Sequence, residues 1–416
     1  MGGAAGCSAR LAQQADERLS AQSYSDSLMS DAILVLNGGS SSLKFAVFDA
    51  SAELSVLLRG NVSSLGQHPR LHVAAAAGSP EIDSSLGDAP IDVAKAFATV
   101  ASLLADRNLL ARIDRVGHRI VHGGRDFTEA TLLDADALEA LQLLEPLAPI
   151  HQRINLGIVA LAAELLPRAR QVGCFDTAFH ATRPGLAKIY GLPRAMTEAG
   201  IASYGFHGLS YSHIAAKLRE RYGAAAGGRA IVAHLGSGAS LCAMEAGRSV
   251  ATTMGFSTLD GLVMSTRCGV LDPGVILYLL QERRLSSEDL ASLLYERSGL
   301  LGVSGVSGDM QVLLGAKVPS AVQAVDLFVY RIGREIGSLA AALGGLDTLV
   351  FSAGIGEHAP LIRHKICAAA EWLGVELDED LNQKSAESVS ARKSRVAILV
   401  IPADEEQAVA RELLTL

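Results

Sequence analysis

The segment at residues 37–44 carries residue types that suit a phosphate group. It reads Asn-Gly-Gly-Ser-Ser-Ser-Leu-Lys and joins the end of one predicted strand to the start of the next. Glycines let backbone N–H groups turn toward an anion, the serine hydroxyls add donors, and Lys44 adds a positive charge. An ordinary polar hairpin uses the same turn residues, so this segment alone fits either interpretation. The chain contains no Gly-x-x-x-x-Gly-Lys-Ser/Thr motif, which disfavours a P-loop NTPase.

A second segment, residues 117–125, concentrates arginine and histidine at the end of another predicted strand. It reads Gly-His-Arg-Ile-Val-His-Gly-Gly-Arg. The planar guanidinium of Arg119 can bind a carboxylate or a transferring phosphoryl group through two hydrogen bonds. A surface salt bridge is the alternative for any single arginine. The grouping of Arg, His and Gly at one strand end favours a functional site.

Two further segments pair a carboxylate or a histidine with a strand or loop end. Residues 175–180 read Phe-Asp-Thr-Ala-Phe-His, and residues 204–208 read Tyr-Gly-Phe-His-Gly. An aspartate that closes a buried strand, such as Asp176, can orient a reacting group or hold a metal ion through water. A histidine in a glycine-flanked loop, such as His207, can donate to a phosphoryl oxygen. A helix-capping aspartate and a histidine at the edge of the core are the structural alternatives.

The second half of the chain adds glycine-rich turns, an arginine and carboxylates. Residues 234–238 and 353–358 are glycine-rich and follow apolar strands, as in loops that approach a nucleotide closely. Arg267 lies in a polar loop at 261–273, and acidic residues follow a strand at 401–406. Those carboxylates could hold Mg²⁺ directly or through water, or could serve only as favourable charges at a helix N-terminus.

The elements that must position these residues recur in the same order in both halves. Expected strands at 32–36, 43–48 and 54–59 form one antiparallel meander, and strands at 230–235, 240–244 and 249–253 form another. The same pattern of strand and Gly/Ser turn begins at Gly38 and at Gly236, which favours duplicated α/β domains with a cleft between them. The other expected elements are helices at 93–104, 135–144, 156–166, 211–222, 361–373 and 405–414, and strands at 113–121, 172–175, 348–351 and 396–401.

Composition restricts the classes of protein that this chain can be. It has 416 residues, 49% of them hydrophobic and 19% charged, which is typical of a folded chain of two or three domains. With 36 Lys and Arg against 44 Asp and Glu, the net charge of −8 repels polyanions, so nucleic acid is not an expected partner. The five cysteines are scattered, which favours a reducing cytoplasm, and no apolar run is long enough to span a membrane. Residues 1–28 are expected to form a mobile tail, with Met29 as an alternative start.

Taken together and in this order, these segments resemble the acetate kinase family of carboxylate kinases, within the actin, sugar kinase and Hsp70 superfamily. The most specific blocks lie at 37–44, 118–124, 175–180, 204–208 and 354–357. The resemblance extends from about residue 33 to residue 414. It implies two duplicated ribonuclease H-like (actin-like ATPase) domains with an interdomain cleft. The expected boundaries are 29–178 plus 403–416 for the acyl and phosphoryl side, and 179–402 for the nucleotide side.

The resemblance also implies the reaction and its participants. ATP and acetate would give ADP and acetyl phosphate by reversible, direct in-line transfer with Mg²⁺, or Mn²⁺ in its place, in a cytoplasmic homodimer. Arg119 and Arg267 would stabilise the phosphoryl oxygens and hold acetate, His207 would steady the transition state, and Asp176 would position substrate or metal-bound water. Further roles implied by the resemblance are Asn37 and Glu405 at the metal, Ser40, Ser42 and Lys44 near the phosphates, His151 and His234 beside the cleft, and Val121, Ile150 and Phe206 in the acyl pocket. The implied nucleotide-binding residues are His234, Leu235, Gly236, Ser237, Gly238, Asp309, Met310, Gln311, Gly354, Ile355, Gly356, Glu357 and His358.

Four positions depart from the family pattern. Ser237, Gln311 and His358 replace the usual Asn, Arg and Asn on the nucleotide side, and Thr258 replaces a proline near the expected acyl pocket. The first three bear on nucleotide affinity and base preference, and the fourth bears on the preferred acid. Two alternatives follow: a propionate or butyrate kinase with the same mechanism, and a nucleotide-binding regulator without turnover.

Overall fold

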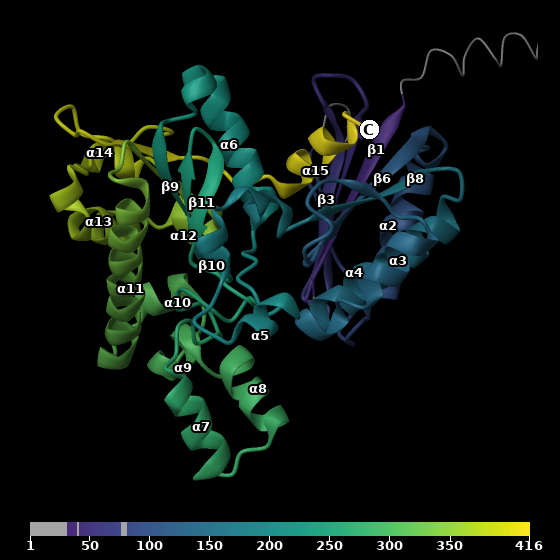
Figure 1. Ribbon diagram of the computed structural model, residues 1–416. Coiled ribbons are helices and arrows are strands. Elements are labelled where there is room, and N and C mark those ends of the chain that lie inside the picture. Colours follow the sequence, from purple (N-terminus) through teal and green to yellow (C-terminus); the bar gives the residue numbers. More distant parts are fainter. Residues whose placement is uncertain (1–30, 40, 76–80) are drawn as a thin grey trace, which may run out of the picture.

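The chain forms two halves, each built around its own β-sheet, in the computed structural model of the protein (Figure 1). The structure describes residues 31–39, 41–75 and 81–416. The expected N-terminal tail, the alternative start at Met29 and the phosphate-side residue Ser40 therefore lie outside the described residues.

The first sheet has eight strands in the order β5-β4-β3-β2-β1-β6-β8-β7. Strands β1, β2 and β3 form the expected antiparallel meander, and β6 and β8 then pair in parallel beside β1. The meander continues into two short strands, β4 and β5, which the sequence analysis did not predict. The bounds are β1 Ala32–Gly38, β2 Leu43–Asp49, β3 Val56–Ser63, β4 Arg70–Val73, β5 Ile82–Ser85, β6 Ile113–Ile120, β7 Thr131–Leu132 and β8 Arg170–Phe175.

Both faces of this sheet are covered, which explains why β1 is an unbroken apolar run. Leu34 and Leu36 point into a core made with α2 (Val93–Asp106) and α4 (Pro149–Leu165). Ile33 and Val35 point the opposite way, into a core made with the C-terminal helix α15 (Glu405–Leu413). A strand buried on both faces loses the apolar–polar alternation of an edge strand. Helix α3 (Ala135–Gln142) packs beside α4.

The second sheet has five strands in the order β11-β10-β9-β12-β13 and repeats the central part of the first. An antiparallel meander, β9 to β11, is again followed by two parallel strands, β12 and β13. The duplication inferred from the two Gly/Ser turns is therefore present in the strand topology. The bounds are β9 Arg229–Leu235, β10 Ala239–Glu245, β11 Arg248–Thr252, β12 Thr348–Ser352 and β13 Ala397–Val400.

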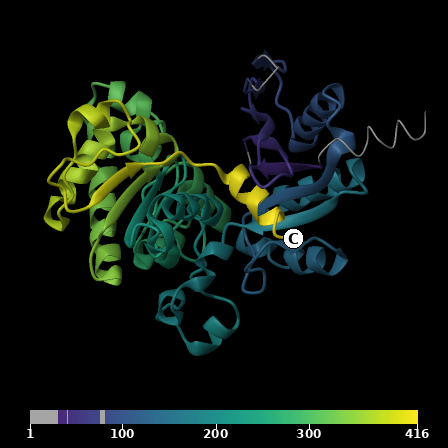
Figure 2. The ribbon, with the colours of Figure 1, turned by 90° about the horizontal axis from the view of Figure 1, so that it is seen from above.

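Helices α6 and α15 join the two halves. Helix α6 (Gly208–Tyr222) covers one face of the second sheet, and α11 (Pro319–Leu343) and α13 (Pro360–Ala369) cover the other. After β13 the chain crosses back, and α15 packs both on the first sheet and against α6 (Figures 1 and 2). The N-terminus of α15 is thereby placed between the two sheets.

Several helices differ from the sequence prediction. Helix α4 begins at Pro149, seven residues before the predicted start, because proline is well tolerated in the first turn of a helix. The glycine-rich segment at 353–358 is a short helix, α12 (Ala353–His358), and the predicted helix at 361–373 ends at Ala369, before a 3₁₀ turn at Glu371–Leu373. Helix α11 was not predicted. The remaining α-helices are α5 Arg194–Glu198, α7 Pro273–Gln281, α8 Ser287–Glu296, α9 Gly299–Ser304, α10 Met310–Gly315 and α14 Glu379–Gln383. Within the described residues, no helix combines the length and apolar character that crossing a bilayer requires.

Candidate active site

Three polar residues of the first half meet because they lie near the carboxyl ends of neighbouring strands. Asn37 lies near the end of β1, Arg119 near the end of β6, and Asp176 directly follows β8. These strands are parallel neighbours, so their carboxyl ends share one edge of the sheet. Ligands bind at this edge in open α/β sheets.

Arg119 is held by a fork of hydrogen bonds. Its Nε lies 3.2 Å from each carboxylate oxygen of Asp176 and its Nη2 lies 2.6 Å from Oδ2, while Nη1 donates to Asn37 Oδ1 at 3.2 Å. Asp176 is almost wholly buried, and burial raises the pKa of its carboxyl group, although the Arg119 charge opposes the shift. Burial disfavours the charge of Arg119, but the neighbouring carboxylates outweigh this effect, raise the pKa of Arg119 and keep the guanidinium charged. These contacts hold the charged guanidinium of Arg119 in one orientation at the sheet edge.

The N-terminus of α15 brings two carboxylates to the same place. Asn37 Nδ2 donates to Glu405 Oε2 at 2.9 Å and to Glu406 Oε1 at 3.0 Å, and Glu405 lies 3.8 Å from Arg119. Despite its burial, Glu405 has a lowered pKa, because the charges of Arg119 and Lys44 and the hydrogen bond from Asn37 stabilise its carboxylate. An ionised carboxylate is a suitable oxygen ligand for Mg²⁺ bound to phosphates, since that ion keeps several waters and needs few protein ligands. Among the described residues, no group of three or more His, Cys, Asp or Glu side chains forms a metal cage.

His207 and Arg267 converge on the glycine turn of the second half. A Cβ atom at Gly238 would lie 3.1 Å from His207 Nε2 and 3.4 Å from Arg267 Nη2, so only glycine leaves this space open. Arg267 is held in place by donation from Nη1 to the carbonyl of Thr258 at 3.0 Å. His207 has a left-handed backbone (φ 59°) at the start of α6, a strained conformation that is concentrated at functional sites.

A second imidazole stacks on His207. The rings of His207 and His234 are 4.3 Å apart and 21° from parallel. Burial lowers the pKa of both, that of His234 to about 4. His151, in α4, has its pKa lowered to about 4 by burial and by the charges of Arg119 and Arg267, which places this histidine in the field of both arginines. All three rings are therefore neutral near pH 7.

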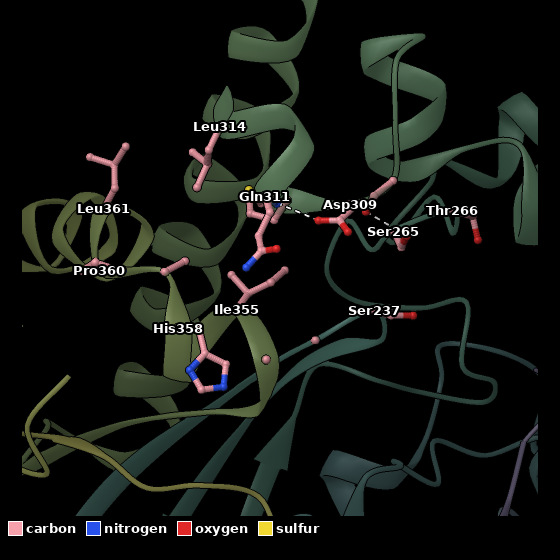
Figure 3. A pocket seen from close by; sticks show the side chains of 15 residues that line it. Ser237, Ser265, Thr266, Asp309, Gln311, Leu314, Ile355, His358, Pro360 and Leu361 are labelled. Atoms are coloured by element: carbon pink, nitrogen blue, oxygen red, sulfur yellow. Dashed lines mark hydrogen bonds between the residues drawn. The ribbon is translucent and has the colours of Figure 1, made fainter. Parts of the chain in front are cut away.

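Two adjoining cavities complete the site. The smaller, about 360 Å³, is lined by the Gly236–Gly238 turn, His234, Lys44, Glu357 and the carboxylates of α15. The larger, about 560 Å³, shares Gly236, Ser237 and Gly354 with it and extends between α10 and α12 (Figure 3). Its remaining wall includes Asp309, Met310, Gln311, Ile355 and His358. Three of the four positions that depart from the family pattern, Ser237, Gln311 and His358, thus face one cavity.

The residues expected to form the acyl pocket lie in an apolar cluster. Val121 and Phe206 are buried in the same core, together with Leu262 and Val263. The side chain of Ile150 lies outside the described residues. Leu235, expected on the nucleotide side, is likewise buried in this core at the end of β9. The expected phosphate-side residue Ser42 follows the β1–β2 turn, where its carbonyl accepts from Gly39 N.

Other residues hold the site together and were not found from the sequence. Ser240 and Ser210 bond the Nδ1 atoms of His207 and His234, each at 2.9 Å. Glu406 accepts a hydrogen bond from Asn37 Nδ2, and Arg363 Nη1 donates to the carbonyl of Gly356 in α12. Single serines and arginines inside apolar segments carry no motif, because only the fold brings them to the site.

Two duplicated α/β halves that both line the smaller cavity, with Arg119 near a strand end of the first half and Arg267 in a loop of the second, define a kinase built from two actin-like ATPase domains. The chain belongs to the acetokinase family, whose model matches residues 32–411. It is 48% identical to an acetate kinase of Rhodopseudomonas palustris strain TIE-1, covering 92% of this chain and 98% of the relative, and 43% identical to one of Methylocella silvestris, covering 93% and 98%.

Solved structures agree with this assignment. A propionate kinase of Francisella tularensis is 32% identical with a TM-score of 0.85, covering 92% of this chain and 98% of that one. An acetate kinase of Porphyromonas gingivalis is 35% identical with a TM-score of 0.82, covering 93% and 99%. The protein is therefore a kinase that transfers phosphate to a carboxylate. The family, fold class and enzyme class inferred from the sequence are confirmed.

Proposed function

We propose that this protein transfers the γ-phosphoryl group of ATP to acetate, reversibly and by direct in-line displacement. The observation that carries the proposal is the convergence of Arg267 Nη2 and His207 Nε2 on Gly238, which lines the same cavity as Lys44 and Glu405. These groups lie where positive charge and N–H donors can surround a phosphoryl group. Phosphoryl transfer depends mainly on such positioning and charge stabilisation.

Each side chain in this mechanism binds or orients, and none is a nucleophile. Acetate is ionised at neutral pH, so it attacks without a general base. One carboxylate oxygen forms a bond to the γ-phosphorus while the bond to the β–γ bridging oxygen breaks and ADP leaves. Arg119, held rigid by Asp176, and Arg267, held by Thr258 O, stabilise the equatorial oxygens, and neutral His207 donates a hydrogen bond to one of them.

The donor set fits a divalent cation bound to the nucleotide phosphates. Glu405 is the ionised carboxylate that faces the smaller cavity, and Asn37 orients it. Mg²⁺, or Mn²⁺ in its place, would be held there directly or through water and would supply charge neutralisation of the β- and γ-phosphates. Since the Asn37 oxygen already accepts from Arg119, the contribution of Asn37 is orientation of Glu405.

Propionate is the second candidate acceptor. The Francisella tularensis structure with a TM-score of 0.85 is a propionate kinase, and Thr258 departs from the family pattern beside Arg267. One methylene group changes binding in an apolar pocket by only about 1–3 kcal/mol, so the two acids would share one mechanism and differ in KM and kcat.

The direct test is to trap acyl phosphate with hydroxylamine in the presence of Mg-ATP and acetate, propionate or butyrate. We expect the highest kcat/KM with acetate, and about a thousandfold lower kcat in Arg267→Ala and Arg119→Lys, because lysine cannot reproduce the fork that holds Asp176 and Asn37. Arg115→Lys is the matched control on the same strand, since Arg115 bonds Asp114 and Leu413 O away from the cavities. A higher kcat/KM with propionate would change the substrate and keep the mechanism. Full turnover by both site variants would refute the mechanism, and no product with any acid would refute the function.

We also infer a domain division, an oligomeric state and a location. The packing of α15 on the first sheet supports a division into 29–178 plus 403–416 and 179–402. The exposed apolar side chains of α7 support a homodimer. The four cysteines within the described residues, Cys174, Cys242, Cys268 and Cys367, are free thiols, which supports a reducing cytoplasm.

A further inference from the structure

The hydrogen bonds at Nδ1 of His207 determine which of its ring nitrogens carries the proton. His207 Nδ1 lies 2.9 Å from Ser240 Oγ, and Ser240 Oγ also bonds the hydroxyl of Tyr211. Ser240 lies in β10 and Tyr211 in α6, so this chain of three groups links the second sheet to the helix that begins beside His207. Ser240 and Tyr211 are both fully buried.

In the hydrogen-bonded series of Tyr211, Ser240 and His207, only one arrangement gives every hydroxyl proton an acceptor. Burial raises the pKa of Tyr211, so its phenol keeps its proton. Within the described part of the chain, the Tyr211 hydroxyl bonds only Ser240 Oγ, so Ser240 must accept from it. The single proton of Ser240 is then directed at His207 Nδ1, which accepts it.

The opposite arrangement would leave a buried hydroxyl proton without an acceptor. If His207 Nδ1 donated to Ser240, Ser240 would either donate to Tyr211 or accept from both groups, and the proton of Tyr211 or of Ser240 would have no acceptor among the described residues. An unsatisfied buried donor costs about 1–3 kcal/mol. The network therefore favours the imidazole with its proton on Nε2.

The protonated nitrogen is the one that faces the active site. His207 Nε2 is the atom 3.1 Å from the Cβ position at Gly238, next to Arg267 Nη2. A neutral imidazole has a single N–H, so a proton on Nδ1 would turn a lone pair toward the negative phosphoryl oxygens. His234 repeats the pattern, because its Nδ1 lies 2.9 Å from Ser210 Oγ.

We propose that Ser240 and Tyr211 are positioning residues that fix His207 in its Nε2–H tautomer, so that a neutral imidazole donates to the transferring phosphoryl group. A serine does this without adding charge, whereas a carboxylate partner would favour imidazolium and place a negative charge close to the phosphates. The kinetic part of this proposal rests on the proposed phosphoryl transfer. The tautomer itself is a property of the free protein.

The test measures the tautomer and the turnover separately in the full-length protein. Histidine ¹⁵N labelling with long-range ¹H–¹⁵N correlation reports the protonated ring nitrogen, and a His207→Asn variant assigns the signal. We expect Nε2–H in the wild type and a mixture of tautomers in Ser240→Ala and Tyr211→Phe. In both variants kcat should fall about five- to tenfold, the factor that one hydrogen bond contributes, with KM for ATP and acetate unchanged within twofold.

The matched control removes a buried hydroxyl from the same sheet at its far end. Thr348 Oγ1 donates to Gly227 O at 2.8 Å at the start of β12, so Thr348→Val should change neither the tautomer nor kcat. Nδ1–H in the wild type, or a fall in kcat without a change of tautomer, would overturn the proposal. Tyr211→Phe keeps the test decisive if Ser240→Ala does not fold. Absence of acyl phosphate formation by the wild type would refute only the proposed function, because the NMR measurement does not depend on turnover.

Discussion

At the scale of single residues, burial lowers the pKa values of several histidines. His118 is buried in β6, where its Nε2 lies 2.8 Å from Gln171 Oε1, and desolvation lowers its pKa to about 4. The pKa values of His122 and His213 are lowered to about 4 in the same way, and that of His180 to about 3. These rings are neutral in the folded chain but take up protons in the unfolded chain below about pH 6.5.

The lowered pKa values predict acid sensitivity with a definite sign. The stability that a neutral buried histidine contributes is complete above pH 6.5 and is lost as the pH falls toward 4, because only the unfolded chain binds the proton in that range. Each such histidine should therefore cost about 1 kcal/mol of unfolding free energy between pH 7 and pH 5.5. Urea unfolding of His118→Gln should show a loss smaller by about that amount than the loss of the wild type. His68→Gln, at an exposed histidine in a surface pair with Asp88, should behave as the wild type. Equal losses of unfolding free energy in the wild type and in His118→Gln would contradict the lowered pKa of His118.

At the scale of elements, the short helix α12 depends on one buried arginine. Arg363, on α13, is fully buried, and its Nη1 donates to the carbonyls of Gly356 and Glu357 at 2.8 Å each. Its Nε and Nη2 donate to Asn382, on α14. Glu357 in turn accepts from Ala403 N at 2.9 Å, in the segment that leads to α15. The wall of the larger cavity and the helix that carries Glu405 are thus connected through a few hydrogen bonds.

Replacement of this arginine should affect stability and nucleotide binding together. Arg363→Met leaves buried carbonyls of α12 without donors, so we expect a loss of about 3 kcal/mol or more of unfolding free energy. Because α12 lines the larger cavity, which we propose to bind the nucleotide, KM for ATP should rise about fivefold or more while KM for acetate stays within twofold. Urea unfolding and steady-state kinetics measure the two effects. Arg70→Met, at an exposed ion pair with Asp83, is the control and should alter neither. An unchanged KM for ATP would show that α12 does not contribute to nucleotide binding.

At the scale of the whole molecule, α7 and α8 project from the second half as a tip, away from both sheets (Figure 1). Helix α7 leaves large apolar side chains exposed: Val275, Leu277, Tyr278 and Leu280. Several large apolar side chains exposed on one helix are typical of a protein interface. A second copy of the chain is the partner expected from the family resemblance.

The predicted homodimer can be tested by removing the apolar surface. Leu277→Asp combined with Tyr278→Asp should convert a dimer of about 87 kDa, twice the 43.4 kDa chain, into monomers in size-exclusion chromatography with light scattering. Buried interface carboxylates without partners would oppose association. Leu143→Asp, at an exposed leucine of the first half, is the control and should leave the mass unchanged. A monomeric wild type would contradict the prediction, and a dimeric double variant would place the interface elsewhere.

The family, the fold class and the duplication could be predicted from the sequence, and its motifs located the candidate site residues. Long apolar runs such as 32–36, and glycine-rich turns at Gly38 and Gly236, are local signals, because strand burial and turn conformation depend on neighbouring residues. Arg119 and Asp176 were found for the same reason, since each lies near the end of a recognisable strand. Helix limits were less certain, as α4 and α12 show, because packing extends or creates a helix where local propensity is weak.

How these residues come together depends on the tertiary structure. The pairing of Arg119 with Asp176, the orientation of Glu405 by Asn37, and the chain from Tyr211 through Ser240 to His207 join positions far apart in the sequence. Such contacts depend on the packing of two sheets and on the return of α15, which no local pattern contains. Protonation states were likewise set by the fold, because burial and neighbouring charges, not residue type, hold His207 and His234 neutral.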